Sequence, residues 1–245
     1  MKRIKLVTAY DGTSYHGSQI QNNGVTIEGV LKEELSSLLK EEINLIGASR
    51  TDAGVHALGN VYVFDTDSRI PAEKFVYALN ARLPEDIRIQ HSCEVPPDFH
   101  PRHQDTVKTY EYRIFNAPMP DPMRRLYTYY SRYRFDVEAM REAGRYLVGE
   151  HDFKSFCSMY TSAKTTVREI LNVEVEEIPC GTRASLSQVC RMPREIVIRV
   201  SGRGFLYNMV RIIAGTLIKV GSGDIAPEEI PVILEKCDKI PFLSS

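Results

Sequence analysis

The chain carries the same succession of strand and helix signals twice, and this recurrence limits the folds that it can adopt. Apolar and polar residues alternate at the start of the chain and again from Lys108, as they do in half-buried strands. Each run is followed by apolar residues at helical spacing, after the capping residues Thr26 and Asp136. The strands form hairpin-like pairs rather than strict strand–helix–strand units, which predicts an α+β protein with a mostly antiparallel sheet and helices on one face. We predict two halves of one plan, residues 1–104 and 105–245.

The positions of the individual elements follow from the same patterns. The expected strands cover residues 4–10, 61–64, 108–115, 168–177 and 194–201. The expected helices begin at Thr26, Pro71, Asp136 and Tyr207, and the last of them stops at Gly221. A further helix that started at Pro227 would be interrupted by Pro231.

The composition is that of an ordinary globular protein. With 245 residues, of which 43 % are hydrophobic and 26 % charged, the chain is long enough for one large core or two modest ones. No apolar run approaches the ~20 residues that a membrane span needs, and the charged, strand-like opening holds no signal region. We therefore expect a cytoplasmic protein. The five cysteines are scattered without a Cys-x-x-Cys pair, which predicts free thiols rather than a zinc or redox site.

One segment, from His100 to Arg134, departs from the nearly neutral charge of the chain. It carries seven basic and three acidic residues, whereas the formal net charge of the whole chain is −1. It also contains six of the thirteen tyrosines. Cations for phosphates and flat rings for bases are what a protein surface offers to RNA. An aromatic-rich core edge rimmed by solvated arginines has the same composition, and composition alone weighs the two interpretations about equally.

A polar loop at residues 47–56 lies between the apolar run Ile43–Ile46 and the expected strand at 61–64. It reads Gly47-Ala48-Ser49-Arg50-Thr51-Asp52-Ala53-Gly54-Val55-His56. Rigid flanks position the side chains that such a loop carries, here Asp52 two residues after Arg50. An aspartate in a glycine-containing loop is most often a turn or cap residue. The functional interpretation makes Asp52 a nucleophile or base and lets Arg50 attract an anionic substrate.

Other candidate residues give weaker signals. His56, His100 and His103 lack the spacing of metal ligands, so we expect solvated or core histidines and no metal site. Arg211 lies inside an apolar helix but off its main apolar stripe. It is either exposed or faces a cleft, where it would pair with a carboxylate.

Taken together, five segments of the chain resemble the TruA-type tRNA pseudouridine synthases, in the order of that family and over nearly the whole chain. The segment with the Arg-Thr-Asp-Ala-Gly-Val-His core is long enough to be specific. The five segments cover residues 47–56, 99–102, 108–113, 147–156 and 205–215.

The resemblance implies a role for individual residues. Asp52 corresponds to the catalytic aspartate, Tyr110 to the aromatic residue that stacks near the target base, and Arg211 to the cation that pairs with the aspartate. Arg50 resembles the arginine that helps to displace the base, and Arg102 an arginine that contacts the RNA backbone.

The resemblance also implies the architecture and the substrate. It implies two RRM-like (ferredoxin-like) halves that share one continuous sheet, with an active-site cleft between them, in a homodimer. The implied substrate is the set of uridines at positions 38 to 40 in the anticodon arm of tRNA, and no cofactor is implied. Tyr112 lies on the same strand face as Tyr110, so the identity of the stacking tyrosine has an alternative, although the surrounding motif favours Tyr110.

The end of the chain departs from the family pattern. Family members usually continue into a Gly-Leu-Tyr-Leu-like strand that places an apolar residue against the target base, whereas residues 240–245 read Ile-Pro-Phe-Leu-Ser-Ser. Either another segment replaces that contact or the protein is less active than its relatives. Two other classes remain as alternatives: a non-catalytic RNA-binding protein, and a glycosidase-like hydrolase that would need a second carboxylate near Asp52.

Overall fold

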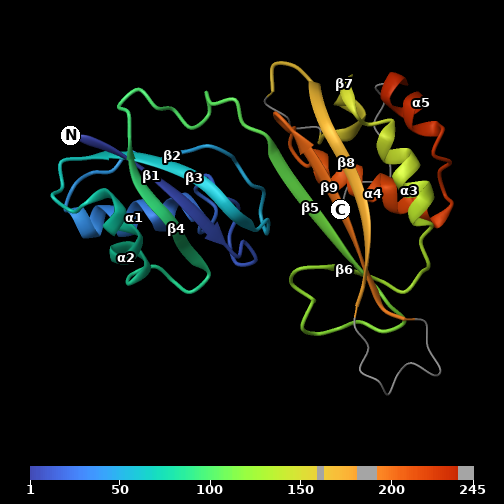
Figure 1. Ribbon diagram of the computed structural model, residues 1–245, viewed down its shortest axis with the longest axis horizontal. Helices are drawn as coiled ribbons and strands as arrows, with labels where there is room; N and C mark the ends of the chain where they lie inside the picture. The colour runs from blue at the N-terminus through green and yellow to red at the C-terminus, as the bar shows by residue number, and fades with distance from the viewer. Residues whose placement is uncertain (159–162, 181–191, 237–245) are drawn as a thin grey trace. The chain divides into compact units, whose positions relative to one another are not determined.

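The chain is divided into two compact α+β units. The computed structural model describes residues 1–158, 163–180 and 192–236 (Figure 1). The first unit comprises Met1–Gln104 and the second Asp105–Ser245. The α+β class predicted from the sequence is confirmed.

The first unit contains a four-stranded antiparallel sheet with the strand order β2-β3-β1-β4. Its strands are β1 (Lys2–Tyr10), β2 (Ile46–Gly47), β3 (Ala57–Thr66) and β4 (Ile87–Val95). Its helices are α1 (Ile27–Leu39), the 3-10 helix η1 (Ala72–Lys74) and α2 (Phe75–Asn80). In Figure 1 both α-helices cover the same face of this sheet. The core between helices and sheet includes Ile4, Leu6, Leu31, Phe64 and Phe75, all buried.

The boundaries of α1 follow from local chemistry. The hydroxyl of Thr26 accepts a hydrogen bond from the amide of Gly29, which satisfies one of the helix amides that have no partner within the helix. The helix ends at Lys40, which adopts a left-handed conformation with φ 58°. Leu31 and Leu35 are fully buried against the sheet, and each such leucine stabilises the fold by about 1.5–3 kcal/mol.

The second unit contains a five-stranded mixed sheet with the strand order β6-β5-β9-β8-β7. Its strands are β5 (Lys108–Asn116), β6 (Tyr129–Ser131), β7 (Gly149–Asp152), β8 (Val167–Pro179) and β9 (Arg194–Gly202). Its helices are α3 (Val137–Arg145), the 3-10 helix η2 (Phe153–Phe156), α4 (Met209–Ser222) and α5 (Glu229–Lys236). Only the pair β5–β6 is parallel among the described strands. Ile114 and Ile198 on the sheet join Met140 of α3 and Ile213 of α4 in one core.

The described strands form two sheets, one in each unit. Two helices near the end of the chain differ from the sequence expectation. Helix α4 continues through Gly221 to Ser222, whereas the sequence predicted a stop at Gly221, and its C-cap is Gly223, which has a positive φ of 84°. Helix α5 is not interrupted by Pro231, because the helix begins at Glu229 and its first turn needs no amide from a proline.

Two further predictions concern thiols and membranes. Cys93, Cys157 and Cys180 are thiols and not part of disulfides, as predicted. The other two cysteines and residues 240–245, where the sequence departs from the family pattern, lie outside the described residues. Over the ranges that the structure describes, none of the helices combines the length and the apolar character required to cross a membrane.

Candidate active site

The loop that carries Asp52 connects β2 to β3 and is fixed to the sheet where it begins. Gly47 of β2 is paired with Tyr62 of β3, and the amide of Ala48 donates to the carbonyl of Val61 at 2.8 Å. The loop therefore leaves the sheet from a defined position, as expected for a loop between two strands.

Ser18, in the segment before α1, holds the middle of this loop. Its amide donates to the carbonyl of Thr51 at 3.0 Å, and its hydroxyl accepts from the amide of Thr51 at 2.8 Å. The same hydroxyl lies 3.5 Å from the carbonyl oxygen of Ser49. Ser18 is fully buried, so these bonds are shielded from water. Sequence analysis missed Ser18, because a serine in a polar loop gives no sign of a partner 33 residues away.

A buried polar cluster lies under the loop. The hydroxyl of Thr51 is 2.8 Å from the phenol oxygen of Tyr10. The amide nitrogen of Asn60 donates to the carbonyl of Ser49 at 3.0 Å, and it also donates to the phenol oxygens of Tyr10 and Tyr62. Burial is the main cause that raises the pKa of both phenols, so both stay neutral. The cluster therefore fixes the loop to the first unit through neutral hydrogen-bonding groups.

The orientation of Arg50 and Asp52 follows from these contacts. The side chain of Thr51 points into the protein, toward Tyr10. Of its two neighbours, Arg50 is exposed, and Asp52 is partly exposed, as Thr51 is. The two charged groups of the predicted site are therefore presented by one anchored segment.

The end of the loop is packed tightly against the turn that follows β1. The amide of Val55 donates to the carbonyl of Asp52 at 3.1 Å, and His56 Nδ1 lies 3.1 Å from the amide nitrogen of Gly12 and 2.9 Å from Asp11 Oδ1. A Cβ atom on Gly12 would lie 2.1 Å from the carbonyl oxygen of Val55, so no larger residue fits there. His56 thus serves the loop conformation, and in the ranges that the structure covers no three histidine, cysteine or acidic residues are grouped as they would be around a metal ion.

Two charged residues lie at the start of the loop. Arg102 Nε donates to the carbonyl of Gly47 at 2.8 Å. Glu28 of α1 is buried beside Gly47, since a Cβ atom on that glycine would lie 2.7 Å from Glu28 Oε1. Burial raises the pKa of Glu28, and the charges of Arg102 and Arg50 oppose this effect. The sequence pattern around Glu28 gives no sign that its carboxyl group lies at the start of the loop.

The remaining predicted residues belong to the second unit. Tyr110 is a partly buried residue of β5, and its ring packs edge-to-face on Phe205 with 5.0 Å between the centroids. Tyr112, two residues further along β5, is close enough to Arg211 for the cation to influence its phenol. Burial raises the pKa of Tyr112, Tyr129 adds to this effect, and Arg211 opposes it. Arg211 itself is exposed on the first turn of α4.

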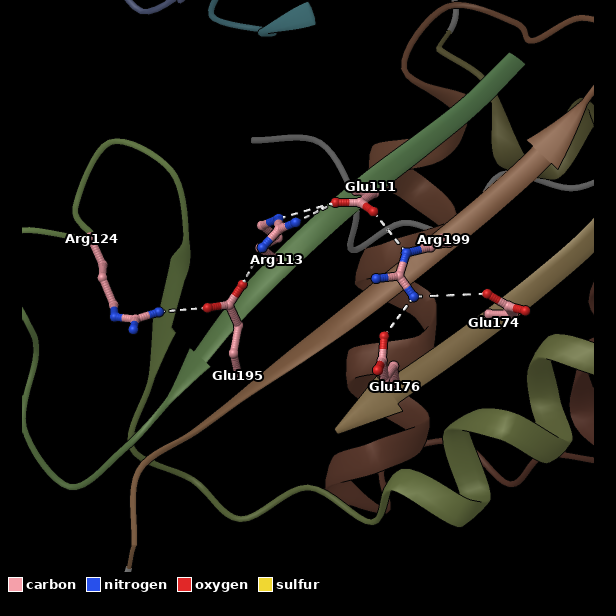
Figure 2. Close-up of polar contacts among 7 residues, drawn as sticks. All are labelled: Glu111, Arg113, Arg124, Glu174, Glu176, Glu195 and Arg199. Atoms are coloured by element: carbon pink, nitrogen blue, oxygen red, sulfur yellow. Dashed lines mark hydrogen bonds and ion pairs between the residues drawn. The ribbon is translucent and has the colours of Figure 1, made fainter. Parts of the chain in front are cut away.

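Two arginines of the basic segment from His100 to Arg134 form ion pairs with a glutamate outside that segment. Arg113 Nη1 and Arg124 Nη1 both contact the carboxylate of Glu195, at 2.8 Å and 2.5 Å (Figure 2). Residues on this sheet alternate between the core and the opposite face, and this network lies on the face opposite the core. Figure 2 draws seven of its members: Glu111, Arg113, Arg124, Glu174, Glu176, Glu195 and Arg199. Arg113 and Arg124 therefore stabilise the second unit, and we do not count them as cations available to RNA.

Comparisons with known proteins show which family the chain is similar to. The family model for tRNA pseudouridine synthase matches residues 6–104 and 143–242. A tRNA pseudouridine synthase A of Acetivibrio thermocellus is 45 % identical over 235 residues, which cover 96 % of this chain and 91 % of that protein. The proteins of the same name from Caldicellulosiruptor bescii and Brevibacillus brevis are 45 % and 44 % identical over 239 residues, 98 % of this chain and 92 % of each relative.

The two units, each an antiparallel or mixed sheet with helices, and the extent of these matches define the class of protein. The chain belongs to the tRNA pseudouridine synthase family, which confirms the resemblance. It is accordingly an isomerase that acts on tRNA.

Proposed function

We propose that this protein converts uridines at positions 38 to 40 of the tRNA anticodon arm into pseudouridine, with Asp52 as the catalytic residue. The observation that carries the proposal is the anchored Arg50–Asp52 segment, in which Thr51 is hydrogen-bonded to the buried residues Ser18 and Tyr10 while Arg50 is exposed and Asp52 partly exposed. A reaction at one base of a large RNA requires a reactive group held in one place.

The reaction is an isomerisation, and its atoms balance without a further reactant. The bond between N1 of uracil and C1′ of the ribose breaks, the base turns, and a bond from C5 to C1′ forms. A proton leaves C5, and N1 gains a proton. An ionised Asp52 has three possible points of action: attack at C1′, attack at C6 of the base, or removal of a proton from the sugar.

A stacked base cannot turn, so the target nucleotide must first leave the stack, at a cost of a few kcal/mol. We assign to Arg50 the displacement of the base, because it is exposed two residues before Asp52. Tyr110 would stack on the freed uracil and assist the loss of the C5 proton. Arg211 would pair with Asp52, lower its pKa and fix its direction. Arg102 would contact the RNA backbone.

The position of the product tests this proposal directly. An unmodified tRNA transcript is incubated with the protein, and pseudouridines are located by carbodiimide labelling and primer extension. We expect modification at positions 38 to 40 and none in a transcript with cytidine at these positions. Pseudouridine confined to another arm would contradict the substrate assignment. Release of free uracil would indicate a hydrolase, and binding without any product would indicate the non-catalytic alternative.

We also propose a homodimer as the functional form, as the family resemblance implies. One chain has a mass of 27.8 kDa, so light scattering after size-exclusion chromatography distinguishes a monomer from a dimer. A fully active protein with the mass of one chain at micromolar concentration would contradict this proposal.

The cytoplasmic location of the protein stays a prediction.

A further inference from the structure

In the first unit, a single buried serine, Ser18, binds both peptide groups of Thr51. Ser18 binds the amide of Thr51 through its hydroxyl and the carbonyl of Thr51 through its amide. The two peptide groups that are held join Thr51 to Arg50 and to Asp52. The plane of each peptide group sets the direction in which the neighbouring Cα–Cβ bond points. Ser18 thereby constrains the direction of both charged side chains.

Ser18 is itself fixed to a rigid element. Its carbonyl accepts from the amide of Glu28 at 2.9 Å, and the carbonyl of Gly17 accepts from the amide of Ile27 at 3.3 Å. These amides lie in the first turn of α1, where helix amides have no partner within the helix. The position of Thr51 is thus set by the start of α1 through Ser18.

The approach of the two segments is too close for a larger residue at position 17. Gly17 has a φ of 88°, and a Cβ atom at this position would lie 2.7 Å from the carbonyl oxygen of Thr51. A left-handed conformation and a backbone contact of this kind both require glycine. The segment is therefore shaped to bring Ser18 against Thr51.

We propose that Ser18 is a positioning residue for Asp52 and Arg50, an inference that rests on the catalytic role proposed for Asp52. The buried serine fixes the loop so that the carboxylate and the guanidinium meet the extruded uridine in one orientation. Ser18 does not touch the substrate in this account, and it acts through Thr51.

The variant Ser18→Ala tests the proposal, because it removes the hydroxyl and leaves the amide of Thr51 without its partner. Ser92→Ala is the matched control. Ser92 is also a buried serine of the first unit, and its hydroxyl accepts from the amide of Val76 at 3.0 Å, away from the loop. Both variants lose one buried hydrogen bond to a backbone amide, so both are expected to lose similar stability.

The two variants should differ in catalysis. We expect the single-turnover rate of Ser18→Ala with tRNA to fall by about tenfold to a hundredfold, since small displacements of reacting groups have effects of this size. The Kd for tRNA should stay within about twofold of the wild type, and Ser92→Ala should keep the wild-type rate. If Ser18→Ala does not fold, Ser18→Cys takes its place: it keeps the approximate shape with a weaker acceptor, and it should lower the single-turnover rate below that of the wild type with the Kd for tRNA unchanged.

Equal single-turnover rates for the two alanine variants would overturn the proposal and leave Ser18 a structural residue. A fall in tRNA affinity without a fall in the single-turnover rate would overturn it as well. Asp52→Asn is measured in parallel: if that variant keeps its activity, the proposed function fails, whereas an inactive Asp52→Asn beside a fully active Ser18→Ala refutes the positioning role alone.

Discussion

Arg102 donates a hydrogen bond from Nε to the carbonyl oxygen of Gly47, at 2.8 Å, and so joins the end of the first unit to the start of the Asp52 loop. The residue is otherwise exposed. Arg102 thus combines a structural contact with the RNA contact that we propose for it. The two functions can be separated, because lysine keeps the charge but lacks the planar group that donates through Nε.

We expect Arg102→Ala to reduce the free energy of unfolding by about 1 kcal/mol and to reduce the slope of log Kd for tRNA against log salt concentration by about one. Arg102→Lys should show the same decrease in the free energy of unfolding, but its slope of log Kd against log salt concentration should equal that of the wild type. Urea unfolding and salt-dependent binding measure the two effects. Arg69→Ala removes an exposed arginine of the same unit and serves as the control. An unchanged salt slope in Arg102→Ala would exclude the RNA contact.

The ion network on the second sheet should matter for stability and not for RNA binding. Glu195 is buried and holds both Arg113 and Arg124, so Glu195→Gln should reduce the free energy of unfolding by about 1–3 kcal/mol. Glu142→Gln, at an exposed position of the same unit, should have little effect. The Kd for tRNA should remain within about twofold in both variants. Weaker tRNA binding by Glu195→Gln, with an unchanged free energy of unfolding, would indicate that this face of the second sheet contacts RNA.

Glu28 should lower the stability of the fold as the pH rises, whereas a carboxylate in an ion pair would raise it. Burial raises its pKa above the usual 4.5, so the folded state prefers the neutral form and is destabilised once the group ionises. We expect Glu28→Gln to be more stable than the wild type at pH 7, and this difference should vanish as the pH falls below about 4.5. Urea unfolding across this range measures it, with Glu33→Gln, exposed on the same helix, as the control. A variant that is less stable at pH 7 would contradict the account.

Two glycines around the Asp52 loop should differ in their tolerance of alanine. Gly54 has a φ of 75° but open space around it, so Gly54→Ala should cost about 1 kcal/mol for the backbone strain. Gly12→Ala should cost more, because its Cβ atom would lie 2.1 Å from the backbone oxygen of Val55 and the backbone must move. Thermal or urea unfolding ranks the two. A smaller loss in Gly12→Ala would contradict the packing described at the loop end.

The elements that the sequence predicted well are those with regular patterns. Thr26 before an apolar stripe predicted α1, and the alternation from Lys108 predicted β5. Strand β4 was missed, because its alternation breaks: Ile87 and Ile89 are buried, and the next buried position is the polar Ser92. The register of β4 against β1 shifts at the same level, which explains the break in the pattern.

The candidate site was only partly predictable for a related reason. The loop with Arg50 and Asp52 stands out in the sequence, but the residues that hold it do not. Ser18 and Asn60 are isolated polar residues whose partners are set by the fold. In the same way, the count of charges in the basic segment could not show that Arg113 is paired, since its partner Glu195 lies 82 residues further along the chain.

Tritium release from tRNA labelled with [5-³H]uridine shows whether Asp52 performs the isomerisation. Formation of the C5–C1′ bond expels the label from C5 into water. We expect release by the wild-type protein and none above background by Asp52→Asn, with tRNA affinity within about twofold of the wild type. Substantial release by a correctly folded Asp52→Asn variant would contradict the account.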